Sequence, residues 1–222
     1  MRNGNFSAFF YIFAQDMEAI YPVVSIGRSF GAGGRAIGKC LSTMTGIPVY
    51  DRELLKESAE EFGFSKEIFI RADEKRPSRF RRLVTQTYGV QEAYLNDTLS
   101  PENLYQAQSL VIRAIAKRGP CIMIGRTADY ILRDFPGLLK IFVHAPVAYR
   151  ARKIVERGDA ANDEEAIELA RQKDKERQNY YNYFTGRKWG EASNYDLTLD
   201  SSLLTPQENA DFISQYLKKV VK

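Results

Sequence analysis

The chain has 222 residues, 44% of them hydrophobic and 27% charged, which is an ordinary composition for a soluble globular protein of one domain. A net charge of +4 suits a protein that binds phosphates and falls short of the strongly basic character of nucleic-acid-binding domains. Cys40 and Cys121 have apolar neighbours and no CxxC spacing, so they predict buried thiols in a reducing, cytoplasmic compartment, and the single histidine, His144, excludes a histidine metal cluster.

The N-terminal segment is apolar and aromatic over Phe6–Ala14 but is too short to span a bilayer. We expect residues 1–20 to form an arm that packs on the domain or on a second copy, which would make a homodimer. Residues 21–222 then form the domain itself. No other run is long and apolar enough to cross a membrane, so no membrane partner is expected.

Short apolar runs and amphipathic segments alternate along the rest of the chain. The apolar runs predict buried strands at Val23–Gly27, Ile47–Tyr50, Cys121–Gly125, Leu138–Val143 and Tyr195–Leu199. Helical spacing predicts helices at Arg35–Thr45, Arg52–Phe62, Glu102–Arg118, Thr127–Arg133, Val147–Arg157, Asp163–Tyr183 and Pro206–Val221, with Ala210, Ile213, Tyr216, Leu217 and Val220 on the inner face of the last. This alternation is typical of an α/β fold with a parallel sheet covered on both faces.

In such a sheet, ligands bind beyond the carboxyl ends of the strands, so the residues that follow each strand are the informative ones. The first strand is followed by RSFGAGGR, in which Gly31, Gly33 and Gly34 allow backbone N–H groups to gather into an anion site at the start of a helix. Arg35 adds a positive charge there, which is unfavourable unless an anion is bound. The alternative is a glycine-rich turn with a solvated arginine.

The second and third strands are also followed by polar residues. Arg126 can form two hydrogen bonds with a phosphate or carboxylate, or can instead pair with Asp129 at the surface. Asp51 can orient a ligand or cap the next helix. His144, at the end of the fourth strand, is expected to be structural.

Two charged segments complete the candidates. Arg171, Asp174 and Arg177 share one face of the long helix and can close over phosphates, although a solvated helix is the ordinary interpretation. The basic loop EKRPSRFRR, residues 74–82, could contact nucleic acid, but a basic surface near a substrate site explains it better.

Five segments in this order resemble the cytidylate kinase-like family of P-loop proteins: SFGAGGRAIGK, IPVYDRELL, CIMIGRTADYILRD, DKERQNYYNYFTGRKWG and NYDLTLDSS. The resemblance runs from about Pro22 to the last helix. It implies a P-loop NTPase-type three-layer α/β/α fold with a five-stranded parallel sheet, helices on both faces, and a helical lid at about residues 160–192.

The resemblance also implies roles for individual residues. Gly34 stands where cytidylate kinases have the loop lysine, so Arg35 would replace that lysine, and Ala36 stands where a Ser or Thr would hold magnesium. The nucleotide-binding residues would be Ser29, Phe30, Gly31, Ala32, Gly33, Gly34, Arg35 and Ala36. The residues that act on the transferred group would be Arg35, Arg126, Arg171 and Arg177, and those that bind the acceptor Asp51, Arg126, Asp174 and Arg177.

The implied reaction is phosphoryl transfer from ATP, with Mg²⁺, to a small phosphorylated acceptor such as CMP. Because the loop lacks its lysine and its hydroxyl, a nucleotide-binding regulatory protein with little or no kinase activity is the second hypothesis. A nucleic-acid-binding module is the third. No metal ligands are predicted among the protein side chains.

Overall fold

The computed structural model describes residues 22–51 and 101–220, and the chain divides into two compact units. One unit comprises residues 1–51 and 115–222, and the other comprises residues 52–114. Of the second unit, only the beginning of helix α7 (Pro101–Arg118) is described. The predicted N-terminal arm, the predicted helix Arg52–Phe62 and the basic loop at 74–82 lie outside the described residues.

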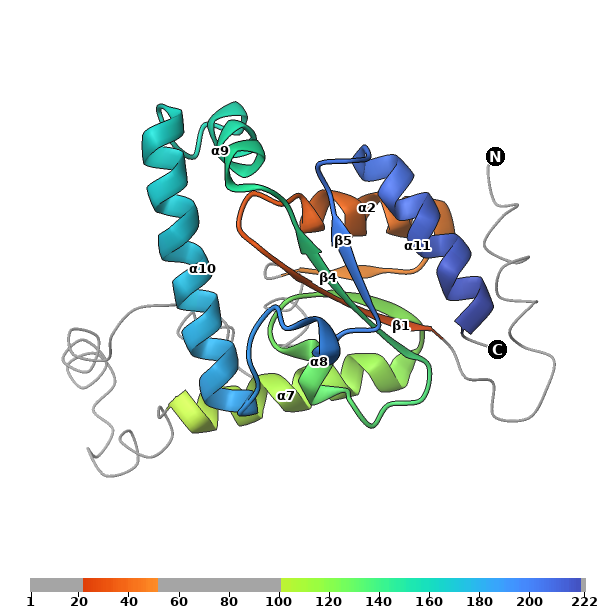
Figure 1. Ribbon diagram of the computed structural model, residues 1–222. Helices are drawn as coiled ribbons and strands as arrows, with labels where there is room; N and C mark the ends of the chain where they lie inside the picture. The colour runs from red at the N-terminus through yellow and green to blue at the C-terminus, as the bar shows by residue number, and fades with distance from the viewer. Residues whose placement is uncertain (1–21, 52–100, 221–222) are drawn as a thin grey trace, which may run out of the picture. The chain divides into compact units, whose positions relative to one another are not determined.

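The first unit is built on a five-stranded parallel sheet, as predicted, and its strands have the order β2-β3-β1-β4-β5 (Figure 1). Its strands are β1 (Val23–Arg28), β2 (Val49–Tyr50), β3 (Cys121–Ile124), β4 (Leu138–His144) and β5 (Leu197–Asp200). Strand β1 is central, with β3 on one side and β4 on the other. Its apolar run has the composition of a strand that is buried on both faces.

Helices follow the strands and return the chain to the sheet. They are α2 (Gly34–Thr45), α8 (Ala128–Ile131), α9 (Val147–Glu156), α10 (Asp163–Thr185) and α11 (Pro206–Val220), with a short 3₁₀ turn, η1 (Ala192–Asn194). Helices α2 and α11 pack together on one face of the sheet, and α8 lies against β1 and β4 on the other (Figure 1). No helix among the described residues has the length and apolar character needed to cross a membrane.

The main core lies between the sheet and the α2–α11 pair. Alternate strand residues face it, because successive side chains of a strand point to opposite faces. Its fully buried members from the strands are Val24, Ile26, Ile122, Ile124, Leu139, Ile141 and Val143, and from the helices Ile37, Leu41, Ala210, Ile213 and Leu217. Val220 was predicted to join this face and is instead 48% exposed, because it lies at the last residue of α11, beyond the core that ends at Leu217.

The opposite face of the sheet carries an aromatic group centred on Phe142 of β4. Its ring packs edge-on against Trp189 at 5.3 Å and tilted against Tyr195 at 5.0 Å. Tyr195 was predicted to start the last strand, but its ring packs beside Phe142 and β5 begins two residues later, at Leu197.

Local sequence fixes the helix ends. The side chain of Asn162 accepts a hydrogen bond from the Glu165 N–H at 2.9 Å and caps α10, whose first turn is acidic. Thr205 and Glu208 exchange hydrogen bonds at the start of α11 as a capping box. Gly46 ends α2 in the left-handed conformation.

Helices α9 and α10 form a separate helical pair with its own small core. Ala151 and Ile154 of α9 pack against Ala166 and Ala170 of α10. Phe30, from the loop after β1, also packs against this cluster. The pair is therefore joined to the loop that follows the central strand.

Both cysteines are free thiols, as predicted. Cys121 is buried in β3, and burial raises the pKa of its thiol to about 12, so it stays protonated and unreactive. Cys40 is only half-buried.

Helix α2 packs closely on β3 at Gly38, where there is no room for a side chain. A Cβ at this position would lie 2.6 Å from Cδ1 of Ile124, so Gly38→Ala should cost about 1–2 kcal/mol of unfolding free energy, although Ala favours helix. Ile124→Val removes that Cδ1 atom. The double variant should then be more stable than the sum of the two single effects by about 1 kcal/mol in chemical denaturation.

The exposed neighbour Lys39 provides the control, since Lys39→Ala should change the unfolding free energy by less than about 0.5 kcal/mol. Additive effects of the Gly38 and Ile124 substitutions would show that this contact does not limit the approach of α2 to the sheet.

Candidate active site

The loop between β1 and α2 offers backbone N–H groups that have no acceptor among the described residues. Gly31 and Gly33 have φ values of 81° and 78°, in the left-handed region that glycine favours. The Ala32 N–H closes the turn by donating to the Ser29 C=O at 3.3 Å. In residues 22–51 and 101–220, no group accepts a hydrogen bond from the N–H of Gly31, Gly33 or Gly34. Adjacent unsatisfied donors at the start of a helix form an anion site.

Helix α2 starts without the groups that usually compensate its positive end. Its N-cap residue, Gly33, has no side chain to accept a hydrogen bond, and the first turn contains no acidic residue. Arg35, the second residue of the helix, adds a full positive charge where the helix dipole is already positive. A bound anion would satisfy the donors and compensate both positive charges.

Arg35 is held in place by Asp51, so the structure brings two predicted site residues together. Nη2 of Arg35 lies 2.6 Å from Oδ2 of Asp51. The Asp51 side chain is 11% exposed and that of Arg35 58%, so the carboxylate is the fixed partner and the guanidinium the accessible one. A guanidinium has five N–H donors, so this pair leaves Arg35 able to bind an anion as well. The helix that Asp51 could cap lies outside the described residues.

The second predicted arginine, Arg126, stands in an unusual corner after β3. Gly125, Arg126 and Thr127 have φ values of 76°, 60° and 53°, so three consecutive residues are left-handed. Such a conformation is unfavourable for the two non-glycine residues by about 1–3 kcal/mol each and persists where the surrounding structure enforces it. The Gly125 N–H donates to the Ile26 C=O at 3.0 Å, which fixes the corner against β1. Strain of this kind is concentrated at functional sites.

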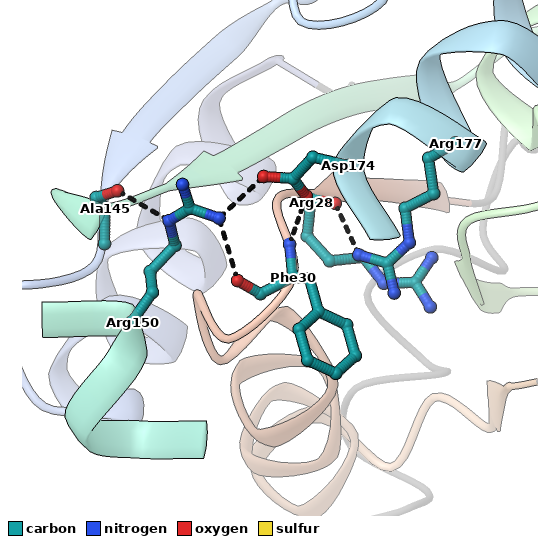
Figure 2. Close-up of polar contacts among 6 residues, drawn as sticks. All are labelled: Arg28, Phe30, Ala145, Arg150, Asp174 and Arg177. Atoms are coloured by element: carbon teal, nitrogen blue, oxygen red, sulfur yellow. Dashed lines mark hydrogen bonds and ion pairs between the residues drawn. The ribbon is translucent and has the colours of Figure 1, made fainter. Parts of the chain in front are cut away.

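The third group of predicted residues, on α10, is attached to the loop itself. Asp174 accepts hydrogen bonds from the Phe30 N–H at 2.7 Å and from Nη1 of Arg150 at 2.6 Å (Figure 2). The same Arg150 also donates to the C=O groups of Phe30 and Ala145, each at 3.0 Å. One carboxylate and one guanidinium therefore link α10 and α9 to the loop.

Arg177 lies one turn further along α10 and also contacts the loop. Its Nη1 donates to the Arg28 C=O at 3.1 Å, and its guanidinium lies 5.3 Å from the centre of the Phe30 ring (Figure 2). Arg157, at the end of α9, contacts the same ring at 5.3 Å. Phe30 thus interacts with two arginines through cation–π contacts and packs on the α9–α10 core.

Arg171 differs from the other predicted residues of α10. It is exposed, and its side chain forms no hydrogen bond or ion pair with any residue that the structure describes. Its predicted role would require movement of α10 or of a ligand. Asp174 and Arg177, by contrast, already contact the backbone of residues 28–30.

Sequence reasoning missed two arginines of this region. Arg150 belongs to α9 and has no spacing relation to the loop, so no pattern marks it before the fold is known. Arg28 ends β1 at the carboxyl edge of the sheet, and the rule that ligands bind at this edge could have identified it. Ser201, which follows β5, donates its hydroxyl to the Ala32 C=O at 2.7 Å and was missed as well.

A buried carboxyl group lies behind the Arg126 corner. Asp129 is 5% exposed and accepts a hydrogen bond from the Tyr181 hydroxyl at 2.7 Å. Burial raises the pKa of Asp129, and the Tyr181 hydrogen bond and the charges of Arg187 and Lys140 oppose that rise. A surface ion pair between Arg126 and Asp129, the alternative considered from the sequence, does not fit this buried geometry.

Comparison with known families decides what kind of protein has this arrangement. The sequence profile of the cytidylate kinase-like family matches residues 23–203, which include all of the predicted site residues. The chain belongs to the cytidylate kinase-like family. It is 24% identical over 186 residues to a cytidylate kinase from Pyrococcus horikoshii, in an alignment that covers 83% of this chain and 82% of that protein.

Solved structures support the fold expected of the family. A protein of uncharacterised function from Eubacterium ventriosum is similar with a TM-score of 0.67 at 23% identity, covering 89% of this chain and 98% of that one. A gluconokinase from Sinorhizobium meliloti is similar with a TM-score of 0.50 at 12% identity, covering 91% and 94%. At these identities the likeness concerns the fold, and the fold is that of P-loop kinases.

The fold and the family together make this chain a kinase-like P-loop protein, with the nucleotide use that the family implies. The likeness alone leaves the acceptor open.

The link between Asp174 and the loop leads to a second prediction. Asp174→Ala should remove the acceptor of the Phe30 N–H and the partner of Arg150, and it should lower the unfolding free energy by about 2 kcal/mol. Hydrogen exchange of the Phe30 amide should become at least about tenfold faster. Glu168→Ala, on the exposed side of the same helix, should change neither measurement. Unchanged exchange at Phe30 would contradict the role of Asp174.

The buried carboxyl of Asp129 leads to a third prediction, on pH. Because burial raises its pKa in the folded state, the unfolded chain loses this proton first as pH rises above the ordinary value of 3.8. Asp129 therefore costs stability as pH rises through the interval between 3.8 and its raised pKa. The melting temperature of Asp129→Asn minus that of the wild type should increase as pH rises through this interval and then stay constant at higher pH.

Asp134→Asn provides the control, because that carboxylate is 77% exposed and should give a difference nearly independent of pH. The prediction is wrong if both variants give the same pH profile.

Proposed function

We propose that this protein transfers the γ-phosphoryl group of ATP to a small phosphorylated acceptor, with CMP as the first candidate. The observation that carries the proposal is the row of backbone donors at Gly31, Gly33 and Gly34, which have no acceptor among the described residues and are followed by the positive end of α2 and by Arg35. Such a site fits a phosphate chain far better than a neutral ligand. The family adds the expectation that the anion belongs to a nucleotide.

The donor phosphates would lie against the loop amides. The unpartnered N–H groups would bind the β-phosphate, and Arg35 would supply the positive charge that a loop lysine supplies elsewhere. Because Asp51 already orients the guanidinium, little entropy would be lost when Arg35 binds. Arg is bulkier than Lys and binds oxygens in a fork, so it would contact two phosphate oxygens rather than one.

The acceptor would be bound across the carboxyl edge, near the strained corner. Arg126 would form a forked pair with the acceptor phosphate, and the enforced left-handed backbone would fix its direction. An acceptor phosphate oxygen is itself nucleophilic, so the chain need not supply a base. Its main contributions would be alignment of the two substrates and neutralisation of charge.

Magnesium would be held mainly by the phosphates and water. When bound, it would neutralise charge on the β- and γ-phosphates. Ala36 has no oxygen ligand, and no cluster of three or more acidic, histidine or cysteine side chains occurs in the part of the chain that is described. The Ser29 hydroxyl is a candidate ligand in the loop. A metal carried in with ATP fits this donor-poor environment.

A second candidate function is nucleotide binding without turnover, as in a regulator. The observation that favours it is the Arg35–Asp51 ion pair, because a guanidinium neutralised by a carboxylate stabilises a phosphate less than a free one does. This alternative predicts tight binding of ATP and no formation of ADP above background. The region proposed from the sequence to contact nucleic acid, residues 74–82, lies outside the described part of the chain.

The experiment is a coupled assay of ADP formation with ATP and Mg²⁺ and a panel of acceptors. CMP, dCMP, UMP, AMP and GMP test phosphorylated acceptors, and gluconate tests an acceptor without phosphate. At least one monophosphate should raise ADP formation above the acceptor-free rate. If none does, thermal-shift measurements with the same nucleotides follow. A melting temperature that rises with ATP would then support nucleotide binding without turnover.

Arg35 supplies the fourth prediction. Arg35→Ala should lower kcat at least about 100-fold, because it removes the cation beside the loop amides. Arg35→Lys should keep part of the rate. Lys39→Ala, one turn along α2 on its exposed side, should keep kcat within about twofold. Equal activity of the wild type and Arg35→Ala would exclude Arg35 from the reaction.

A further inference from the structure

Arg28 occupies a special position in the sheet. It is the last residue of the central strand β1, which lies between β3 and β4. The chain leaves β1 toward α2 on one face and leaves β3 toward α8 on the other (Figure 1). Neighbouring strands whose connections leave to opposite faces create a crevice at their carboxyl ends, and ligands of open α/β sheets bind there.

The side chain of Arg28 crosses this crevice. Its stem lies over the start of α2, since a Cβ on Gly34 would be 2.9 Å from Cβ and 3.1 Å from Cγ of Arg28. Its guanidinium lies over the corner after β3, since a Cβ on Gly125 would collide with Nη1 and lie 3.1 Å from Cζ. One side chain therefore extends from the unsatisfied loop amides to the residue before Arg126.

The backbone of Arg28 is fixed by the helical pair. Arg177 donates to its C=O at 3.1 Å, and Asp174 holds the amide of Phe30 two residues later (Figure 2). The direction of the Arg28 side chain is thus set by α10 as well as by the strand. A guanidinium whose stem is held by packing loses little freedom when it binds a ligand.

Several positively charged groups lie around the crevice. Arg28 and Arg126 lie at neighbouring strand ends, Arg177 reaches the Arg28 carbonyl, and the α2 N-terminus adds its positive dipole. A guanidinium placed among these positive groups is suited to an anion whose negative charge is spread over several oxygens. A phosphoryl group in transit, with charge on its three equatorial oxygens, has this character.

We propose that Arg28 is a catalytic residue that contacts the transferred phosphoryl group between the loop amides and the Arg126 corner. This inference rests on the proposed phosphotransferase function and names a residue of the same site. In the step, an acceptor phosphate oxygen forms a bond to the γ-phosphorus while the bond from that phosphorus to the β–γ bridging oxygen breaks. ADP leaves with the electron pair, and Arg28 stabilises the charge on the equatorial oxygens.

A purely structural role makes a different prediction. If Arg28 only filled the space beside Gly34 and Gly125, its loss would lower stability and weaken nucleotide binding together. A catalytic contact is made most strongly in the transition state, so its loss lowers kcat while the affinity for ADP stays nearly constant.

The test compares Arg28→Gln and Arg28→Lys with the wild type, and Arg133→Gln serves as a matched control because this exposed arginine stacks on Tyr130 at the end of α8. We expect Arg28→Gln to lower kcat about 100-fold or more, with ADP affinity and melting temperature near wild type. Arg28→Lys, which keeps the charge, should recover part of kcat. The proposal is overturned if Arg28→Gln keeps kcat within about threefold, or if ADP affinity falls as much as kcat.

A binding measurement keeps this test separate from the proposed function. Inorganic tripolyphosphate has no base or sugar and is long enough to extend from the loop amides toward the corner, and calorimetry measures its affinity without turnover. Wild type should bind it at least about tenfold more tightly than Arg28→Gln and as tightly as Arg133→Gln. If no acceptor is phosphorylated but this difference is found, the phosphotransferase function fails and Arg28 remains an anion-binding residue of the crevice. Equal affinities, or no binding by the wild type, overturn the proposal for Arg28.

Discussion

The carboxylate of Asp174 connects the helical pair α9–α10 to the loop that follows β1. One oxygen accepts the Phe30 N–H, and the other pairs with Arg150, which in turn binds the Phe30 carbonyl. Both side chains of the ion pair are largely shielded from water, so the geometry is more constrained than in an exposed pair. The loop takes its shape partly from this contact. A shift of α10 would therefore also move the amides of the loop.

This coupling changes the meaning of the residues on α10. The resemblance in sequence implied that Asp174 and Arg177 bind a ligand from a helical lid. In the structure both are bonded to the backbone of residues 28–30. Ligand binding by Arg177 would therefore compete with, or add to, a contact that already exists. The same applies to Arg35, whose guanidinium is paired with Asp51.

The sheet and most helices were predictable from the sequence because their signals are local. Runs of four to six residues identified the strands, and the helical spacing of apolar residues identified the helices. The glycine-rich loop and Arg126 were predictable for a related reason, since they directly follow strands at the edge where ligands bind. These inferences needed no knowledge of distant contacts.

The partners of those residues were not predictable in the same way. Arg150 and Ser201 reach the loop from positions 120 and 169 residues away in the sequence, and the hydrogen bonds that they form depend on the completed fold. The left-handed Arg126 and Thr127 were also hidden, because neither residue type signals a positive φ. Spacing identifies which residues are near a strand end, but not what holds them there.

The long sequence separation within the loop's contacts has a consequence for synthesis of the chain. The loop emerges from the ribosome early, but the residues that hold it arrive much later: Arg150, Asp174 and Arg177, and finally Ser201, whose hydroxyl bonds to the Ala32 carbonyl. A nascent chain that ends before residue 201 lacks part of this support. The hydrogen bonds that hold the loop should therefore be completed late in translation, once the C-terminal strand has joined the sheet.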